Sequence, residues 1–177
     1  MGILSNIKVP VTEEQEAAVL RLEAEDFGPV ANRVKKDFGY SDERIAEGIE
    51  ALKQYYVAAI LDSRNRHAIS TDVDPFWHTH VMFSKEYMQF GVDIFGKYMH
   101  HEPLDHDDTE RLDLVTQVYE YTRGVYDQLF HKWNKKLTPP VDTQRLCVCC
   151  VMGSNVSKDD PMYDQGLFEL QPFMASV

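Results

Sequence analysis

The sequence predicts a mainly α-helical fold, a single-domain bundle of about five helices with an irregular C-terminal tail. Two observations lead to this prediction. Apolar residues recur at steps of three and four along most of the first 138 residues, which is the spacing of one buried helix face. A capping residue or a proline precedes these stretches, and a glycine or a proline follows them. We therefore predict a helical domain over residues 1–138 and a C-terminal arm or tail over residues 139–177.

Three helices are predicted in the first third of the chain. The first begins with a capping-box pattern, Thr12-Glu13-Glu14-Gln15, and is expected to end near Gly28. The second begins at Pro29, which suits a first helical turn, and ends at Gly39. The third begins at Ser41, a capping residue followed by two acidic residues at the positive end of the helix dipole.

The middle of the chain predicts a further helix after a polar connection over residues 62–74. Asp74 is expected to cap this helix, with Pro75 as its first residue. An interruption is expected near Gly91 and the end at Gly96.

A long last helix is predicted to begin at Asp107 or Asp108 and to be ended by Pro139-Pro140. Residues 145–152 are rich enough in β-branched residues for a short strand, but the sequence offers such a strand little to pair with.

The charge of the chain argues against two classes of partner. Acidic residues outnumber basic ones 29 to 18, which gives a net charge of −11, and no strong basic patch interrupts this excess. We therefore expect neither nucleic acid nor an anionic membrane as a partner. No secretory signal pattern is visible, and the three cysteines are confined to residues 147–150 rather than spread as in a secreted scaffold. These features predict a cytoplasmic protein.

Histidines gather in one part of the sequence and predict a metal site. Five of the seven lie between His78 and His106, and imidazole is a common protein ligand for zinc, copper and non-haem iron. Asp74 and His78 lie one helical turn apart, whereas His80 lies about 200° away from His78 around the helix. The candidate metal ligands are His78, His100, His101 and Asp74, with His80 and His106 as weaker candidates.

The residues around these histidines resemble a known family. The stretch Val73–Tyr87 followed by Phe95–Pro103 is similar to the glycine-rich-domain-containing-protein-like family. The matching positions are Asp74, Trp77, His78, Ser84, Tyr87, Gly96, His100, His101 and Pro103. The family has no defined activity, so the resemblance implies a relative rather than a reaction. It strengthens the metal hypothesis, because its polar residues are those that the helical spacing selects.

The cysteine cluster allows a second, weaker hypothesis. In an extended backbone Cys147 and Cys149 point to the same side, where two thiolates could hold a soft ion such as Cu(I) or Zn(II). Adjacent Cys149 and Cys150 are poorly placed to bridge each other. The alternative reading is that all three are reduced thiols on an irregular tail, since no further ligands complete a zinc site.

Two functions from different classes remain open. The first is a small metal-binding helical protein, holding Zn, Fe or Cu at the histidine site, which includes a metal-dependent enzyme of unknown substrate. The second is a non-catalytic protein-interaction module, in which the same polar residues form a buried structural network. In that case a protein partner would bind through the C-terminal tail, where Phe168, Leu170 and Phe173 are apolar.

Overall fold

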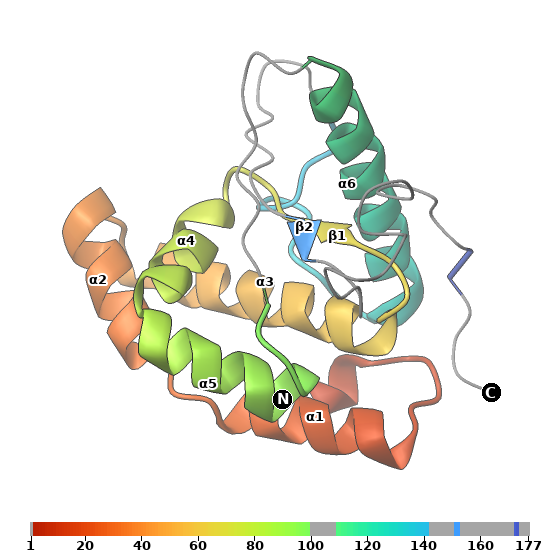
Figure 1. Cartoon of the computed structure of the whole chain (residues 1–177). Coiled ribbons are helices and arrows are strands. Elements are labelled where there is room, and N and C mark those ends of the chain that lie inside the picture. The colour runs from red at the N-terminus through yellow and green to blue at the C-terminus, as the bar shows by residue number, and fades with distance from the viewer. Residues whose placement is uncertain (1, 100–108, 142–150, 153–171, 174–177) are drawn as a thin grey trace.

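The structure is a computed structural model and describes residues 2–99, 109–141, 151–152 and 172–173 (Figure 1). These residues contain six α-helices, one short 3₁₀-helix and two short strands. The helices are α1 (Glu13–Ala24), α2 (Gly28–Phe38), α3 (Asp42–Leu61), α4 (Asp74–Met82), α5 (Ser84–Phe95) and α6 (Thr109–Leu129); the remaining elements are η1 (Leu4–Asn6), β1 (His67–Ala68) and β2 (Val151–Met152). The predicted mainly α-helical fold is confirmed. No helix of this described part is both long and apolar enough to cross a membrane.

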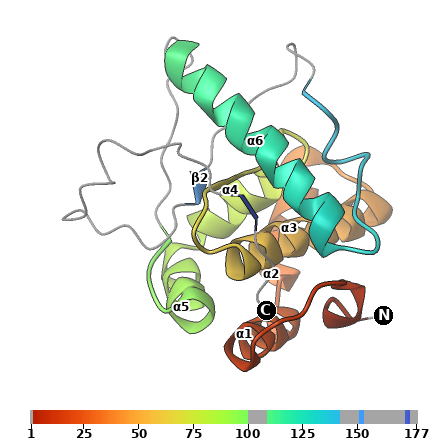
Figure 2. The same cartoon turned by 90° about the vertical axis from the view of Figure 1, so that its right-hand side faces the viewer.

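Helix α3 is the centre of the fold. It packs against α1, α2, α4 and α6, and every residue from Gln54 to Leu61 is buried. Figures 1 and 2 show α1 and α5 on one side of α3 and α6 on the opposite side. A helix that is covered from several directions must be apolar around most of its circumference, as the second half of α3 is. The largest fully buried side chains of the core include Tyr55 and Tyr56 from this helix and Trp77 from α4.

Local signals fix several helix ends as the sequence predicts. Both hydrogen bonds of the capping box are present, from Gln15 N to Thr12 Oγ1 at 3.2 Å and from Thr12 N to Gln15 Oε1 at 3.0 Å. The hydroxyl of Ser41 accepts from the third amide of α3 in the same manner. Gly39 and Gly96 follow α2 and α5 with φ values of 66° and 72°, a left-handed conformation that favours glycine.

The predicted interruption near Gly91 is wrong. The helical chain breaks instead at Phe83, whose φ and ψ of −79° and 60° lie outside the helical region and separate α4 from α5. Gly91 lies inside α5, where the backbone of the returning segment approaches closely. A Cβ atom at position 91 would be 2.8 Å from the carbonyl oxygen of Lys97. This glycine therefore serves close packing rather than a change of helix direction.

Two predicted helix ends are also displaced. Helix α1 ends at Ala24, before Gly28, and α6 ends at Leu129, well before Pro139-Pro140. At the end of α6 the N-terminal segment joins the backbone: Ile7 forms a bridge with Phe130. The chain after α6 then turns back along that helix, where Tyr119 Oη donates to the carbonyl of Pro139 at 2.7 Å. Tertiary contacts, rather than the prolines, thus end the helix.

The connection between α3 and α4 is buried rather than a simple polar loop. It contains β1, which pairs antiparallel with β2, so that His67 lies opposite Met152 and Ala68 opposite Val151. The strand expected within residues 145–152 therefore has a partner, β1, which the sequence does not reveal. The connection is polar because its side chains bond to one another and to α6 in the interior.

Candidate functional site

Asp74 and His78 form a hydrogen-bonded pair at the start of α4. Asp74 Oδ2 lies 2.8 Å from His78 Nδ1, one helical turn further along the chain. Val73 is the residue that precedes the helix, so the carboxyl group of Asp74 is not its cap and is turned toward His78 instead. The side chain of His78 is 39% exposed and that of Asp74 13% exposed. The pair thus lies at the surface, where an ion in solution can reach it.

The carboxyl group of Asp74 stabilises the protonated form of the His78 ring relative to the neutral form. The hydrogen bond that His78 Nδ1–H donates to Asp74 raises the pKa of His78 above its usual value, against the smaller opposing effect of burial. A carboxyl group that holds Nδ1 of an imidazole also fixes the orientation of the ring, and it directs Nε2 toward a ligand. Asp74 and His78 each make further interactions in addition to this bond.

His80 faces the core, away from the Asp74–His78 pair, as its position on the helix predicts. Its Nδ1 lies 2.8 Å from the hydroxyl of Tyr56 on α3. Rings of Phe27, Tyr87 and Phe90 contact it edge-on at centroid distances of 4.7 to 5.2 Å. Burial lowers the pKa of His80 to about 4, so the ring is neutral at pH 7. We therefore leave His80 out of the candidate metal site.

Successive contacts between aromatic rings connect His78 with Tyr98, which lies near the end of the described segment after α5. The His78 ring contacts Trp77 at 5.4 Å between centroids, and Trp77 contacts Tyr87 of α5 at 6.5 Å. Tyr87 in turn contacts Tyr98 at 6.0 Å, edge-on. The close approach at Gly91 brings residues 97–99 back along α5 and so makes this last contact possible. The chain thus returns toward α4 just before His100.

The other predicted ligands lie outside the described residues. These are His100, His101 and His106 of the histidine cluster and Cys147, Cys149 and Cys150 of the cysteine cluster. Within the part of the chain that is described, no three His, Cys, Asp or Glu residues form a group that could hold a metal ion. The described structure therefore contains one predicted ligand pair, Asp74 and His78, of the candidate site.

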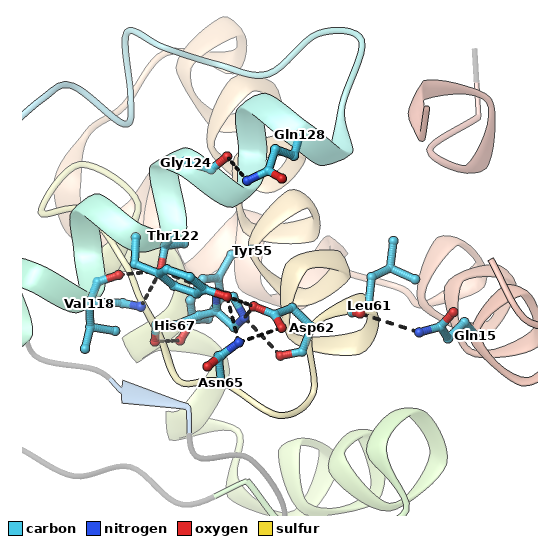
Figure 3. A network of polar contacts seen from close by, with 12 residues as sticks. Gln15, Tyr55, Leu61, Asp62, Asn65, His67, Val118, Thr122, Gly124 and Gln128 are labelled. Atoms are coloured by element: carbon cyan, nitrogen blue, oxygen red, sulfur yellow. Dashed lines mark hydrogen bonds and ion pairs between the residues drawn. The ribbon is translucent and has the colours of Figure 1, made fainter. Parts of the chain in front are cut away.

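A buried polar network between α3, β1 and α6 was not predicted from the sequence (Figure 3). The hydroxyl of Tyr121 on α6 donates to Asp62 Oδ2 at 2.6 Å, and Asn65 Nδ2 donates to Asp62 Oδ1 at 2.8 Å. His67 Nε2 lies 3.4 Å from Asp62 Oδ2, and neither side chain is more than 2% exposed. One sequence signal points to this network. The six residues that follow the buried end of α3, residues 62–67, are all polar.

The network includes a Thr–His–Asp sequence of contacts that does not form a nucleophilic site. Thr122 Oγ1 lies 3.4 Å from His67 Nδ1, on the opposite side of the ring from Asp62. However, the Thr122 hydroxyl donates to the carbonyl of Val118 at 2.8 Å and accepts from Ala68 N at 3.1 Å. Thr122 is 1% exposed, so a substrate has no access to its oxygen. The network instead joins the end of α3 to α6.

Comparison with known proteins gives one family. The model of a family described as UCP032817-like matches residues 22–135. The match takes in α2 to α6 and with them Asp74 and His78. No curated protein and no solved structure has a significant match to the chain. The match does not test the resemblance to the glycine-rich-domain-containing-protein-like family, which stays a prediction. By this comparison the chain belongs to the UCP032817-like family.

Proposed function

We propose that the protein binds a metal ion through His78, with Asp74 as the residue that orients this histidine. The remaining protein ligands would be His100 and His101, from the segment that follows α5. The observation that carries the proposal is the 2.8 Å bond between Asp74 Oδ2 and His78 Nδ1 at a partly exposed position. Carboxylate–histidine pairs of this kind are typical of the imidazole ligands of zinc and other transition metals.

The geometry favours one of two roles for Asp74. Its Oδ2 is directed at the imidazole Nδ1, so the metal would be bound through the other ring nitrogen, His78 Nε2. The carboxyl group would then hold the orientation of the ring without contacting the metal. A direct bond from Asp74 to the ion would compete with this hydrogen bond. We therefore propose that Asp74 is a supporting residue and that the imidazoles are the ligands.

The position of Tyr98 supports the choice of His100 and His101. Three successive ring contacts join His78 to Tyr98. His100 follows Tyr98 by two residues, a length of chain that spans at most about 7 Å. The segment that carries His100 and His101 thus continues directly from a residue that these ring contacts link to His78.

The donor set indicates which ions are candidates. Neutral imidazoles suit Zn(II), Fe(II) and Cu(II) rather than Mg²⁺ or Ca²⁺, which prefer oxygen ligands. With three imidazole ligands an ion keeps an open position, where it can lower the pKa of a bound water or polarise a substrate oxygen. The residues named here would hold the ion, and the partly exposed side of His78 would leave that position accessible.

Elemental analysis tests the proposal. Protein prepared without an affinity tag is analysed for zinc, iron and copper, and metal-free protein is titrated with each ion by calorimetry. We expect a stoichiometric amount of one ion, and we expect His78→Ala and His101→Ala each to abolish tight binding. His131→Ala is the control, because His131 is an exposed histidine beyond the end of α6. Protein that contains no metal and binds none on titration would overturn the proposal and favour the interaction-module alternative.

A further inference from the structure

A cleft lies between α1 and the C-terminal ends of α3 and α5, separate from the Asp74–His78 pair. Its volume is about 490 Å³, within the range of small-molecule sites. The lining comes from one face of α1, from Ala59 to Asn65 at the end of α3, and from Val92 to Met99. No residue of α4 contributes to it. The cleft therefore offers a binding site that the metal hypothesis does not use.

The lining of the cleft contains a few buried apolar side chains and several kinds of polar group. Ala18, Ile60 and Met99 are buried apolar residues of the lining. Ser63 and Asn65 add a hydroxyl and an amide at the end of α3. A pocket with an apolar body and a few polar groups is the usual form of a site for a small polar molecule.

Lys97 supplies a positive charge that no carboxylate of the described residues neutralises. The residue is partly buried and lines the cleft. Within the described parts of the chain no carboxylate forms an ion pair with Lys97, in contrast to Lys35, which pairs with Asp42. Burial lowers the pKa of Lys97, and no carboxylate in the described part of the chain acts in the opposite direction. An ammonium group that has lost part of its hydration in this way gains most from an anionic ligand.

Arg21 adds a second cation to the same cleft. Its Nε donates to the backbone carbonyl of Asp93 at 2.8 Å, which holds the guanidinium between α1 and α5. A guanidinium has five N–H donors in a planar arrangement. Nε is the only nitrogen of the Arg21 side chain with a hydrogen-bond partner among the described residues, so the terminal nitrogens can bind a planar carboxylate.

The cleft also contains two acidic residues, Glu14 and Asp93, which limit the kind of anion that fits. The carboxylate of Asp93 accepts from Gln89 Nε2 at 2.9 Å, one turn earlier on α5. A large, highly charged anion such as a nucleotide would be repelled by these carboxylates and by the net charge of −11. A small ligand with one or two negative charges can contact Lys97 and avoid them.

We propose that this cleft binds a small polar organic acid, whose carboxylate is held by Lys97 and Arg21 and whose body lies on Ala18, Ile60 and Met99. The proposal does not depend on metal binding, since none of these residues is a candidate metal ligand. It assigns the protein a second site, for a carboxylate-bearing metabolite rather than for a phosphate-rich one.

The test is a binding titration with three carboxylates, propionate, succinate and benzoate, at millimolar concentration and constant ionic strength. Succinamide is the uncharged counterpart of succinate. Shifts of the Asn65 side-chain amide and of the Ala18 methyl group in NMR spectra report on occupancy of the cleft. We expect saturable shifts at both positions with at least one carboxylate, and none with succinamide.

Two lysine variants establish where the carboxylate binds. Lys97→Gln removes the charge and is expected to weaken binding by about tenfold or more, whereas Lys97→Arg should keep part of it. Lys85→Gln is the matched control, because Lys85 is an exposed lysine at the start of α5 and does not line the cleft. Unfolding transitions without ligand show that each variant is folded. The proposal is wrong if no carboxylate shifts these signals, or if Lys97→Gln binds as tightly as Lys85→Gln.

Discussion

The ring of Phe76 on α4 occupies the volume that a Cβ atom at Gly48 of α3 would need. An ideal Cβ at position 48 would overlap Cζ, Cε1 and Cε2 of this ring. Phe76 is fully buried and lies between Asp74 and His78 in the sequence. The contact between Gly48 and Phe76 therefore sets how closely α4 packs on α3, and with it the position of the candidate metal site.

Replacement of Gly48 by alanine is expected to destabilise the fold, although alanine is the better helix former. The added methyl group must displace the Phe76 ring, at a cost of about 1–3 kcal/mol in the free energy of unfolding. Gly124→Ala is the control, because a Cβ at this exposed position of α6 meets nothing within 4 Å. That variant should gain about 0.5–1 kcal/mol. Urea unfolding measures both, and equal shifts in the same direction would contradict the packing argument.

The sequence predicts those features that depend on local interactions. Thr12, Ser41 and Gly96 cap helices through contacts with backbone only a few residues away. Their roles could therefore be inferred from the neighbouring residues in the sequence. The Asp74–His78 pair is of the same kind, because a helical spacing of four residues brings the two side chains together.

Features that depend on distant segments could not be predicted in this way. The pairing of β1 with β2 joins residues more than eighty positions apart, and the end of α6 is set by the N-terminal segment at Ile7. The sequence predicts a helix break near Gly91, because the residues around it do not reveal that Lys97 returns against it. The network around Asp62 was missed for the same reason, since its partner Tyr121 is 59 residues away.

Removal of the Tyr121 hydroxyl is expected to weaken the fold more than removal of the Tyr119 hydroxyl. Tyr121→Phe leaves the buried Asp62 carboxyl group without its 2.6 Å donor, which costs about 1–3 kcal/mol. Tyr119→Phe removes one bond to the carbonyl of Pro139 and should cost about 1 kcal/mol. The free energies of unfolding from urea titrations at pH 7 compare the two. A larger loss in Tyr119→Phe would show that the network contributes little.

His80 is expected to make the fold less stable as the pH falls below neutrality. Its pKa is about 4 in the folded protein and about 6.5 in an unfolded chain, so between these values the unfolded state binds the additional proton. The stability contributed by the neutral ring is complete above pH 6.5 and is lost progressively toward pH 4, by at most roughly 3 kcal/mol. His80→Asn cannot titrate, and its amide oxygen keeps an acceptor for Tyr56 near the position of Nδ1. The stability difference between wild type and this variant should therefore shrink from pH 7 to pH 5; a constant difference would contradict the assigned pKa.

Replacement of Asp74 by asparagine is expected to change His78 in two measurable ways. The hydrogen bond that His78 donates to Asp74 is the main cause of the raised pKa of His78, and burial alone would lower it, so Asp74→Asn should lower this pKa in an NMR titration. Because the folded pKa of His78 is raised, the pair stabilises the fold fully below pH 6.5 and loses this effect as the pH rises through the folded value. The variant should thus lose more stability at pH 5 than at pH 8.

If the pair orients a metal ligand, the affinity for zinc should also fall by about 10- to 100-fold in Asp74→Asn. Asp72→Asn is the control, since Asp72 pairs with Arg44 and not with His78. An unchanged pKa of His78 in Asp74→Asn would contradict the role given to Asp74, whereas a lowered pKa with unchanged zinc affinity would leave the pair a structural contact of α4.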